Sequence, residues 1–294
     1  MAGATREIDE ALVRALLQAQ FPDYALLPLS PVGAAGTDNA IFRLGHNLCV
    51  RLPRVDWARH TAAREVAILP KFSGLGMDVP RPIALGEPEQ GYPWQWSIMS
   101  WISGDTVGTD PLPDLINSAQ ELAAFILAMR SVPLEPAFRF GASNNYRGAP
   151  LRQRGQAFQA AVEALVDIYD PKVLSHIWAL SFEAEEADHL PVWIHGDLHG
   201  GNLLKRDGKL VAVIDWGLAG VGDGACELSA AWALFDDASR GIFKAALNVS
   251  EAEWMRGAGW ALSIAAIFLA YYRDKGVPTD MSRRTLNRLV EAFA

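Results

Sequence analysis

The stretches that decide the fold are Ile194-His195-Gly196-Asp197-Leu198-His199-Gly200-Gly201-Asn202 and Leu210-Val211-Ala212-Val213-Ile214-Asp215-Trp216-Gly217. Three polar side chains stand at fixed offsets in them: Asp197, Asn202 five residues on, and Asp215 thirteen beyond that. Each lies beside residues apolar enough to be buried, and a buried carboxylate needs a partner or a function. The pattern therefore predicts a polar site, whereas the alternative interpretation takes both aspartates as ordinary turn acids.

The three side chains match what phosphoryl transfer needs. A triphosphate with magnesium needs hard oxygen ligands, which a carboxylate and an amide oxygen provide, and a second carboxylate can receive the proton of an acceptor hydroxyl. Base, amide ligand and carboxylate ligand follow one another in this order in eukaryotic-like kinases. We expect strands at 192–194 and 210–214, with 205–209 as the turn between them.

The joint pattern His-Gly-Asp-Leu-His-Gly-Gly-Asn, then Ile-Asp-Trp-Gly, resembles the aminoglycoside phosphotransferase family, in the choline kinase-like branch of the protein kinase-like superfamily. The resemblance implies an α/β (α+β), bilobal protein kinase-like fold. A small β-sheet lobe would bind nucleotide over residues 1–102, with a hinge near 99–103. A helical lobe over 103–294 would carry catalysis and substrate binding.

The same resemblance implies the reaction and its cofactors. The γ-phosphoryl group of ATP, or of GTP, would pass directly to a substrate hydroxyl in the presence of Mg²⁺. Asp197 would orient the hydroxyl and take its proton, and Asn202 and Asp215 would be the metal ligands. Asp223 would cap the following helix, and Glu227 would buttress the catalytic loop.

A metallohydrolase is the rival interpretation of the same residues. His195, Asp197 and His199 alternate and would place three ligands on one side of a strand. A catalytic zinc site usually has three protein ligands with an ordered second shell, and the other histidines lack metal-like spacing. The glycines at 196, 200 and 201 interrupt a strand and favour a loop, so this pattern is the weaker one.

A glycine-containing turn upstream meets the first demand of a kinase interpretation. Gly33, Gly36, Thr37 and Asn39 lie between two apolar runs, where backbone N–H groups can approach phosphate oxygens. Alone the signal is weak, because most glycine-rich turns are only turns. Neither a Walker pattern nor a clean Gly-x-Gly-x-x-Gly occurs, which disfavours P-loop and dinucleotide-binding folds.

The second demand is a cation that holds the phosphates, and the third is a carboxylate that orients this cation. Arg51 stands where the family usually has Lys, and its planar fork is not equivalent to an ammonium point charge. Glu65 lies in an expected helix over 57–72, beside apolar residues at helical spacing. Arg51 is thus a departure from the family pattern that bears on the phosphate geometry. The alternative interpretation of Glu65 is a solvated helix acid.

The run Trp94–Gly104 reads as a strand followed by a turn, and resembles the hinge between kinase lobes. We expect backbone groups of about Met99 to Trp101 to bind the adenine. Because backbone would read the base, these residues do not distinguish ATP from GTP. Trp101 also admits a pure packing role, which is the commoner fate of an aromatic side chain.

Composition bounds the class of protein. The 294 residues are 50% hydrophobic and carry a net charge of −8, which disfavours nucleic-acid binding and suits a cationic small molecule. Two cysteines, Cys49 and Cys226, are too few for a disulfide framework, and the acidic amino terminus lacks the features of a signal peptide. We expect a cytoplasmic protein with no membrane span, and residues 258–272 as a buried helix.

The carboxy-terminal half shows helical periodicity. Helices are expected over 115–130, 151–167, 173–189, 226–235 and 251–272. The Pro-, Gly- and Asn-rich segment 132–150 is expected to be a loop that lines the acceptor site. Carboxylates that could hold a cationic acceptor are Asp236, Asp237, Glu251, Glu253, Asp274, Asp280 and Glu291.

The acceptor expected first is an aminoglycoside-type antibiotic. Similar chains phosphorylate macrolides, choline, sugars or homoserine, and a fold does not fix a function. A second class of function is a nucleotide-binding pseudokinase or regulatory module, suggested by Arg51 in place of Lys. The oligomeric state stays open.

Overall fold

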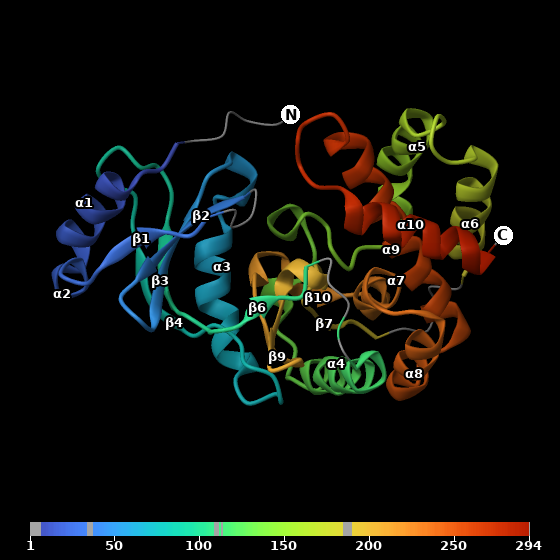
Figure 1. Cartoon of the computed structure of the whole chain (residues 1–294), viewed down its shortest axis with the longest axis horizontal. Helices are drawn as coiled ribbons and strands as arrows, with labels where there is room; N and C mark the ends of the chain where they lie inside the picture. Colours follow the sequence, from blue (N-terminus) through green and yellow to red (C-terminus); the bar gives the residue numbers. More distant parts are fainter. Residues whose placement is uncertain (1–6, 34–37, 109–111, 113, 185–189, 294) are drawn as a thin grey trace. The chain divides into compact units, whose positions relative to one another are not determined.

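The chain divides into two compact units. The computed structural model describes residues 7–33, 38–108, 112, 114–184 and 190–293. One unit combines Met1–Ser103 with Ala212–Leu218, and the other combines Gly104–Val211 with Ala219–Ala294 (Figure 1). Residues 212–218, which include Asp215, thus pack with the first unit, whereas the sequence-based division placed everything after residue 102 in the second.

The first unit is built on a five-stranded antiparallel sheet in the order β1-β2-β3-β5-β4. Its strands are β1 (Leu29–Pro31), β2 (Asn39–Leu44), β3 (Leu48–Pro53), β4 (Pro82–Gly86) and β5 (Trp96–Ser100), and its helices are α1 (Glu10–Gln20), α2 (Pro22–Ala25) and α3 (Thr61–Ile68). The strand expected within 94–104 corresponds to β5, and Arg51 lies on β3.

Alternation along β3 separates the two faces of this sheet. Val50 and Leu52 are fully buried in a hydrophobic core that also holds Val13, Leu16 and Leu17 of α1. Arg51 points to the opposite face, because successive side chains of a strand alternate, and there it meets α3. The sheet therefore uses one face for its core and offers the other to polar chemistry.

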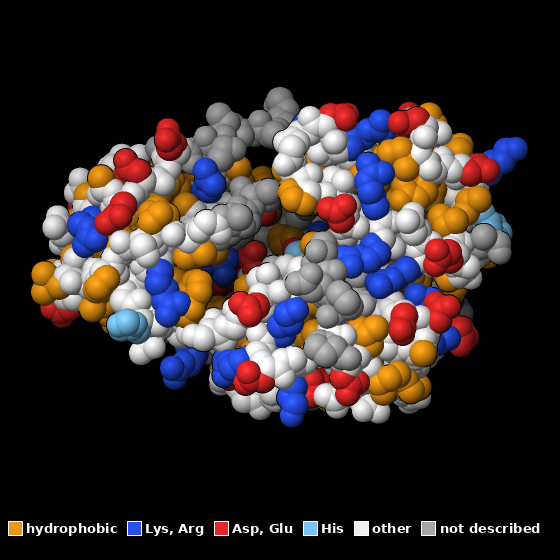
Figure 2. Space-filling model, in the orientation of Figure 1, with side chains coloured by type: hydrophobic (Ala, Val, Ile, Leu, Met, Phe, Trp, Pro, Cys, Tyr) orange, Lys and Arg blue, Asp and Glu red, His pale blue; other side chains and the backbone are white. Residues whose placement is uncertain are grey.

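The second unit is mainly helical. Its helices are α4 (Leu115–Arg130), α5 (Gly155–Ala164), α6 (Pro171–Glu183), α7 (Ser229–Leu234), α8 (Asp237–Leu247), α9 (Glu251–Tyr272) and α10 (Asp280–Phe293). The long helix α9 packs against α5, α6, α7 and α10. No described helix is long and apolar enough to cross a membrane. On the face shown in Figure 2, Lys and Arg side chains are interspersed with Asp and Glu.

The expected helices are found with different boundaries. The predictions for 115–130 and 251–272 match α4 and α9, and 258–272 lies within α9. The helix expected over 57–72 is confined to α3, with 3-10 turns on both sides, because Pro70 cannot continue an α-helix. The helices expected at 151–167 and 226–235 begin with 3-10 turns. The helix expected at 173–189 corresponds to α6 at 171–183, and residues 185–189 lie outside the described part.

Short strands carry the loops of the central sequence pattern. They are β6 (Asp105–Thr106), β7 (Val192–Ile194), β8 (Leu203–Arg206), β9 (Lys209–Val213) and β10 (Gly220–Gly222). The strands expected at 192–194 and 210–214 correspond to β7 and β9, but the chain between them also contains β8: β7 pairs with β10, and β9 lies next to β8. The turn is tighter than expected, because Asp207 and Gly208 adopt left-handed backbone angles that close it within two residues.

Candidate active site

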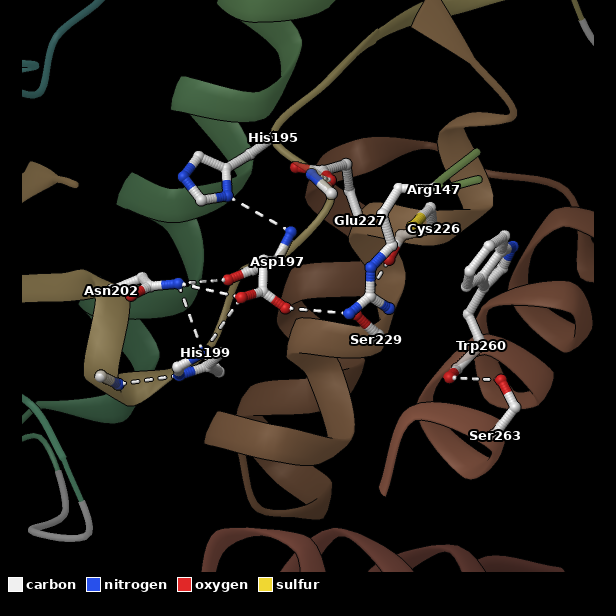
Figure 3. Close-up of polar contacts among 12 residues, drawn as sticks. Arg147, His195, Asp197, His199, Asn202, Cys226, Glu227, Ser229, Trp260 and Ser263 are labelled. Carbon is white, nitrogen blue, oxygen red and sulfur yellow. Dashed lines mark hydrogen bonds and ion pairs between the residues drawn. The ribbon is translucent and has the colours of Figure 1, made fainter. Parts of the chain in front are cut away.

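The loop after β7 is held from below by a buried carboxylate. Gly196 donates its N–H to Glu227 Oε1 at 2.7 Å, and Glu227 is fully buried. The His195 ring is also fully buried, and its Nδ1 accepts the Asp197 N–H at 3.3 Å (Figure 3). These bonds fix the backbone that presents Asp197, and they give Glu227 the buttressing contact that the resemblance implied.

The Asp197 carboxylate has a different set of partners on each oxygen. Oδ1 accepts from Arg147 Nη2 at 3.2 Å, and Oδ2 lies 3.3 Å from Asn202 Nδ2 and 3.4 Å from His199 Nε2. Burial raises the pKa of Asp197, but the charges of His199, Arg147 and His195 outweigh burial and hold this pKa well below its usual range. The side chain is 25% exposed, so an ionised carboxylate remains accessible.

Asn202 is the last residue of a 3-10 turn (Gly200–Asn202), and hydrogen bonds within the same loop orient its side-chain amide. Its Nδ2 donates to the Asp197 carbonyl at 3.0 Å, as well as to the carboxylate. The side-chain oxygen Oδ1 has no hydrogen-bond partner among the described residues, and an oxygen is a harder metal ligand than the amide nitrogen. An amide oxygen held in this way fits a magnesium ligand.

The geometry does not support the metallohydrolase interpretation. The segment 195–199 is a loop, not a strand, so its side chains do not alternate on one face. His195 turns inward, and His199 Nδ1 is occupied by the Gly201 N–H at 3.0 Å. Within the described ranges no group of three or more His, Cys, Asp and Glu side chains could hold a metal ion.

Arg51 joins two carboxylates in the first unit. Its Nη2 donates to Asp215 Oδ1 at 2.7 Å, and its Nη1 lies 3.3 Å from Glu65 Oε1. The guanidinium fork can contact both acids at once, which a single ammonium group does less readily. The two terminal nitrogens of Arg51 thus contact Glu65, the acid expected to orient it, and Asp215, the acid expected to bind metal.

Glu65 is not a solvated helix acid, because it is 1% exposed. Besides Arg51, its Oε1 accepts the Trp216 N–H at 2.9 Å, which links α3 to the residue after Asp215. Burial raises the pKa of Glu65, whereas Arg51 lowers it. Asp215 has a left-handed backbone (φ 64°) and a 41% exposed side chain, so its second oxygen can reach a ligand.

The other expected nucleotide contacts lie in the same unit. Gly36 and Thr37 lie outside the described residues. Gly33 is exposed, and a Cβ there would meet no described atom within 4 Å, so the described residues give no steric reason for a glycine at this position. Asn39 begins β2 and is buried.

The residues expected at the hinge take part in strand and loop pairing. Met99 lies inside β5 and pairs with both neighbouring strands, and the Trp101 N–H donates to the Asn47 carbonyl at 2.7 Å. The Trp101 ring is covered by Arg43, whose guanidinium carbon lies 4.3 Å from the ring centroid. Backbone N–H groups in this segment are therefore engaged within the first unit, those of Ser100 and Trp101 by the Arg81 and Asn47 carbonyls.

Sequence reasoning missed Arg147, which lies fifty residues before Asp197. The only signal was its place in the expected acceptor loop 132–150, where turn-forming residues surround a cation. The prediction for Asp223 is confirmed, since its Oδ1 accepts the Ala225 N–H and caps a 3-10 turn; its carboxylate also binds Arg256 at 2.8 Å. Both cysteines are buried free thiols.

A small antiparallel-sheet unit, a helical unit and an Asp197–Asn202 loop define a protein kinase-like phosphotransferase. The model of the phosphotransferase enzyme family matches residues 30–260, so the chain belongs to that family. It is therefore a phosphotransferase that uses an alcohol group as acceptor. No curated protein matches the chain.

Solved structures share this fold at low sequence identity. Aminoglycoside 2′-phosphotransferase-IIIa with GDP aligns with a TM-score of 0.71 and 18% identity, over 97% of this chain and 98% of that chain. Macrolide 2′-phosphotransferase type I aligns with a TM-score of 0.62 and 17% identity, over 96% and 99%. ADP-bound APH(2″)-Ib gives 0.62 and 15%, over 97% and 99%.

Proposed function

We propose that this protein transfers the γ-phosphoryl group of ATP or GTP to a hydroxyl of an aminoglycoside-type antibiotic. The observation that carries the proposal is the Asp197 carboxylate, kept ionised by its neighbours yet one quarter exposed, in the loop typical of the family. Such a group can accept a hydrogen bond from an acceptor hydroxyl and take its proton as transfer proceeds.

Each remaining role goes to a residue of suitable chemistry. Asn202 Oδ1 and the Asp215 carboxylate would hold Mg²⁺, which when bound neutralises phosphate charge. Arg51, oriented by Glu65, would steady the phosphates, and the turn from Gly33 through Gly36 and Thr37 to Asn39 would cover them. The base would lie near Met99 and Trp101.

The choice of acceptor rests on the structural neighbours and on charge. Neighbours of the same fold were solved with kanamycin and with gentamicin, and another with streptomycin and ATP. The net charge of −8 suits a polyamine-like ligand. Most of the carboxylates expected to hold its amines have other partners: Asp236 caps α8, and Asp237, Glu251, Glu253 and Asp274 pair with Arg240, Lys244, Arg130 and Arg273. Asp280 and Glu291 on α10 are the two that have no such pair within the described chain.

The test is phosphoryl transfer from γ-labelled ATP, and separately GTP, to a panel of acceptors. The panel holds kanamycin, gentamicin and streptomycin, then a macrolide, choline, simple sugars and homoserine, with Asp197→Ala as control. We expect a labelled aminoglycoside that depends on Mg²⁺ and on Asp197. Label on a different acceptor would replace the acceptor class, and transfer unaffected by Asp197→Ala would overturn the assigned mechanism.

A nucleotide-binding module without transfer is the second candidate, and one observation favours it. Both terminal nitrogens of Arg51 are engaged by Glu65 and Asp215, which a phosphate-binding cation would have to leave in part. This candidate predicts nucleotide binding by calorimetry with no labelled product from any acceptor. Arg51→Lys distinguishes the two, because it should retain measurable transfer only if the wild-type protein is an enzyme.

A further inference from the structure

The segment from Gly141 to Gly148 is a hydrogen-bonded loop that contains two non-glycine residues with left-handed backbones. Asn145 and Tyr146 have φ angles of 51° and 54°. Such conformations cost free energy, particularly for a bulky side chain, and persist only where the surrounding structure enforces them. Strained backbone of this kind is common at functional sites, where it holds a side chain in a required position.

Several contacts enforce this conformation. Asn144 is fully buried, and it accepts the Gly141 N–H at 2.9 Å and donates to the Arg147 carbonyl at 3.0 Å. Gly148 also has a positive φ, and its carbonyl accepts the Asp223 N–H at 2.8 Å. A Cβ on Gly148 would lie 2.6 Å from Ile194 Cδ1, so the loop fits closely against the strand that leads to the catalytic loop.

What this loop delivers is the guanidinium of Arg147. Arg147 is 8% exposed, and Figure 3 shows its side chain directed at Asp197 from outside the catalytic loop. The contact to Asp197 Oδ1 is its one ion pair, while Nε and Nη1 are buried without hydrogen-bond partners in the described structure. Arg154 adds a second cation nearby, whose pKa is lowered by burial and then by the Arg147 charge.

This arrangement is poor for stability alone. A buried cation with unsatisfied donors and a like-charged neighbour costs more than an apolar side chain of the same size would. The geometry instead suits control of the carboxylate. Arg147 holds Oδ1, and Asn202 and His199 hold Oδ2, so rotation of the Asp197 carboxylate is restrained from both sides.

We propose that Arg147 is the positioning residue of the catalytic base: it fixes the orientation in which Asp197 receives the acceptor hydroxyl. The proposal rests on the proposed function, because it takes Asp197 as the base. Within the described part of its own unit, Arg147 pairs with Asp197 and makes no hydrogen bond or ion pair with Asn202, the expected metal ligand there, so its removal should act on the transfer step and not on nucleotide binding.

The test compares Arg147→Met and Arg147→Lys with wild type. We expect Arg147→Met to lower kcat by roughly 10–100-fold, the size of effect that misplaced reacting groups have, with the nucleotide KM unchanged. Arg147→Lys keeps the charge and one donor, and should recover part of kcat. Arg154→Met is the matched control, since it removes a neighbouring cation that binds Ser263 and not Asp197.

A double-mutant cycle with Asp197→Asn separates positioning from mere support of the fold. If Arg147 acts through the carboxylate, Arg147→Met should lower kcat much less in the Asp197→Asn protein than in wild type. An equal loss in both backgrounds, or an equal loss in Arg154→Met, would overturn the proposal. Thermal unfolding of every variant shows whether it is folded at the assay temperature.

The two proposals fail in different ways. If the wild-type protein labels no aminoglycoside, the proposed function is wrong; if Asp197→Asn leaves transfer unchanged, Asp197 is not the base and the role given to Arg147 is refuted with it. If Asp197→Asn abolishes most transfer while Arg147→Met keeps wild-type kcat, the proposed function stands and the role of Arg147 is refuted.

Discussion

The two units hold their functional carboxylates in opposite ways. In the first, one guanidinium, Arg51, serves two acids, Glu65 and Asp215. In the second, one acid, Asp197, has Arg147 as its ion-pair partner and Arg154 as a further nearby cation. An excess of negative charge suits a site for Mg²⁺, and an excess of positive charge suits a site where phosphate charge accumulates. The ratio of arginines to carboxylates therefore differs between the two units, and with it the charge of the ligand that each group suits.

The largest expected effect separates the base from the metal ligand. Asp197→Asn should lower kcat by roughly 10²–10⁴-fold, the usual contribution of a general base, while nucleotide affinity stays near wild type. Initial rates with labelled ATP and calorimetric nucleotide binding measure the two quantities. A parallel loss of nucleotide affinity would show that Asp197 contributes to nucleotide binding as well as to the transfer step.

Removing Arg51 tests the acid-rich group. Arg51→Met leaves the buried Glu65 and the half-exposed Asp215 without their counter-charge, and should cost about 3 kcal/mol of unfolding free energy. Urea unfolding measures this. Arg59→Met, which breaks an exposed pair with Asp56 and an exposed hydrogen bond to His60, is the control and should cost less than about 1 kcal/mol. Equal costs would mean that the Arg51 group adds no special stability.

Glu227 makes the stability of the second unit depend on pH. Burial raises the pKa of Glu227 to about 7 from 4.5, despite the N–H bonds from Gly196 and His195. Between these values the folded state keeps a proton that the unfolded chain has lost, so unfolding free energy falls as pH rises, by about 3 kcal/mol in all. Below pH 4.5 this contribution is fully present.

Glu227→Gln should remove this dependence while keeping an acceptor for Gly196. Unfolding free energy measured from pH 4.5 to 7.5 should then vary less than in wild type, and exposed Glu163→Gln should leave the wild-type slope unchanged. An unchanged slope in Glu227→Gln would show that Glu227 is ionised throughout this range.

Asp215 gives the smallest expected effect of the set. Asp215→Asn keeps a carbonyl oxygen but loses the charge, and should weaken Mg²⁺-dependent nucleotide binding by roughly 10–100-fold, comparable to other disturbances of metal sites. Magnesium titrations of nucleotide affinity measure it. Asp207→Asn, in the turn between β8 and β9, should leave the magnesium dependence as in wild type.

Local patterns explain which parts of the fold were predictable. Helices α4 and α9 match their sequence predictions because apolar residues recur at helical spacing over many turns. Strand pairing around the catalytic loop was not predicted, because short strands carry no signal for their partners. The β7–β10 pair is settled by packing of residues far apart in sequence.

The candidate site divides in the same way. Asp197 and Asn202 lie five residues apart, so the turn between them brings their side chains together, and the spacing alone predicts the contact. Trp101 is the opposite case. Its N–H donates to the Asn47 carbonyl, and no sequence pattern predicts this bond between a strand end and a turn.

The sequence by itself determined the family, the two-part architecture and the polar loop, because these depend on periodicity and on residues close together along the chain. Only the tertiary structure decided which arginine meets which acid. Arg51 reaches Asp215 across 164 positions and Arg147 reaches Asp197 across 50. The physical reason is that an ion pair depends on distance in space, and a chain with 26 basic and 34 acidic residues allows far too many pairings for composition to select one.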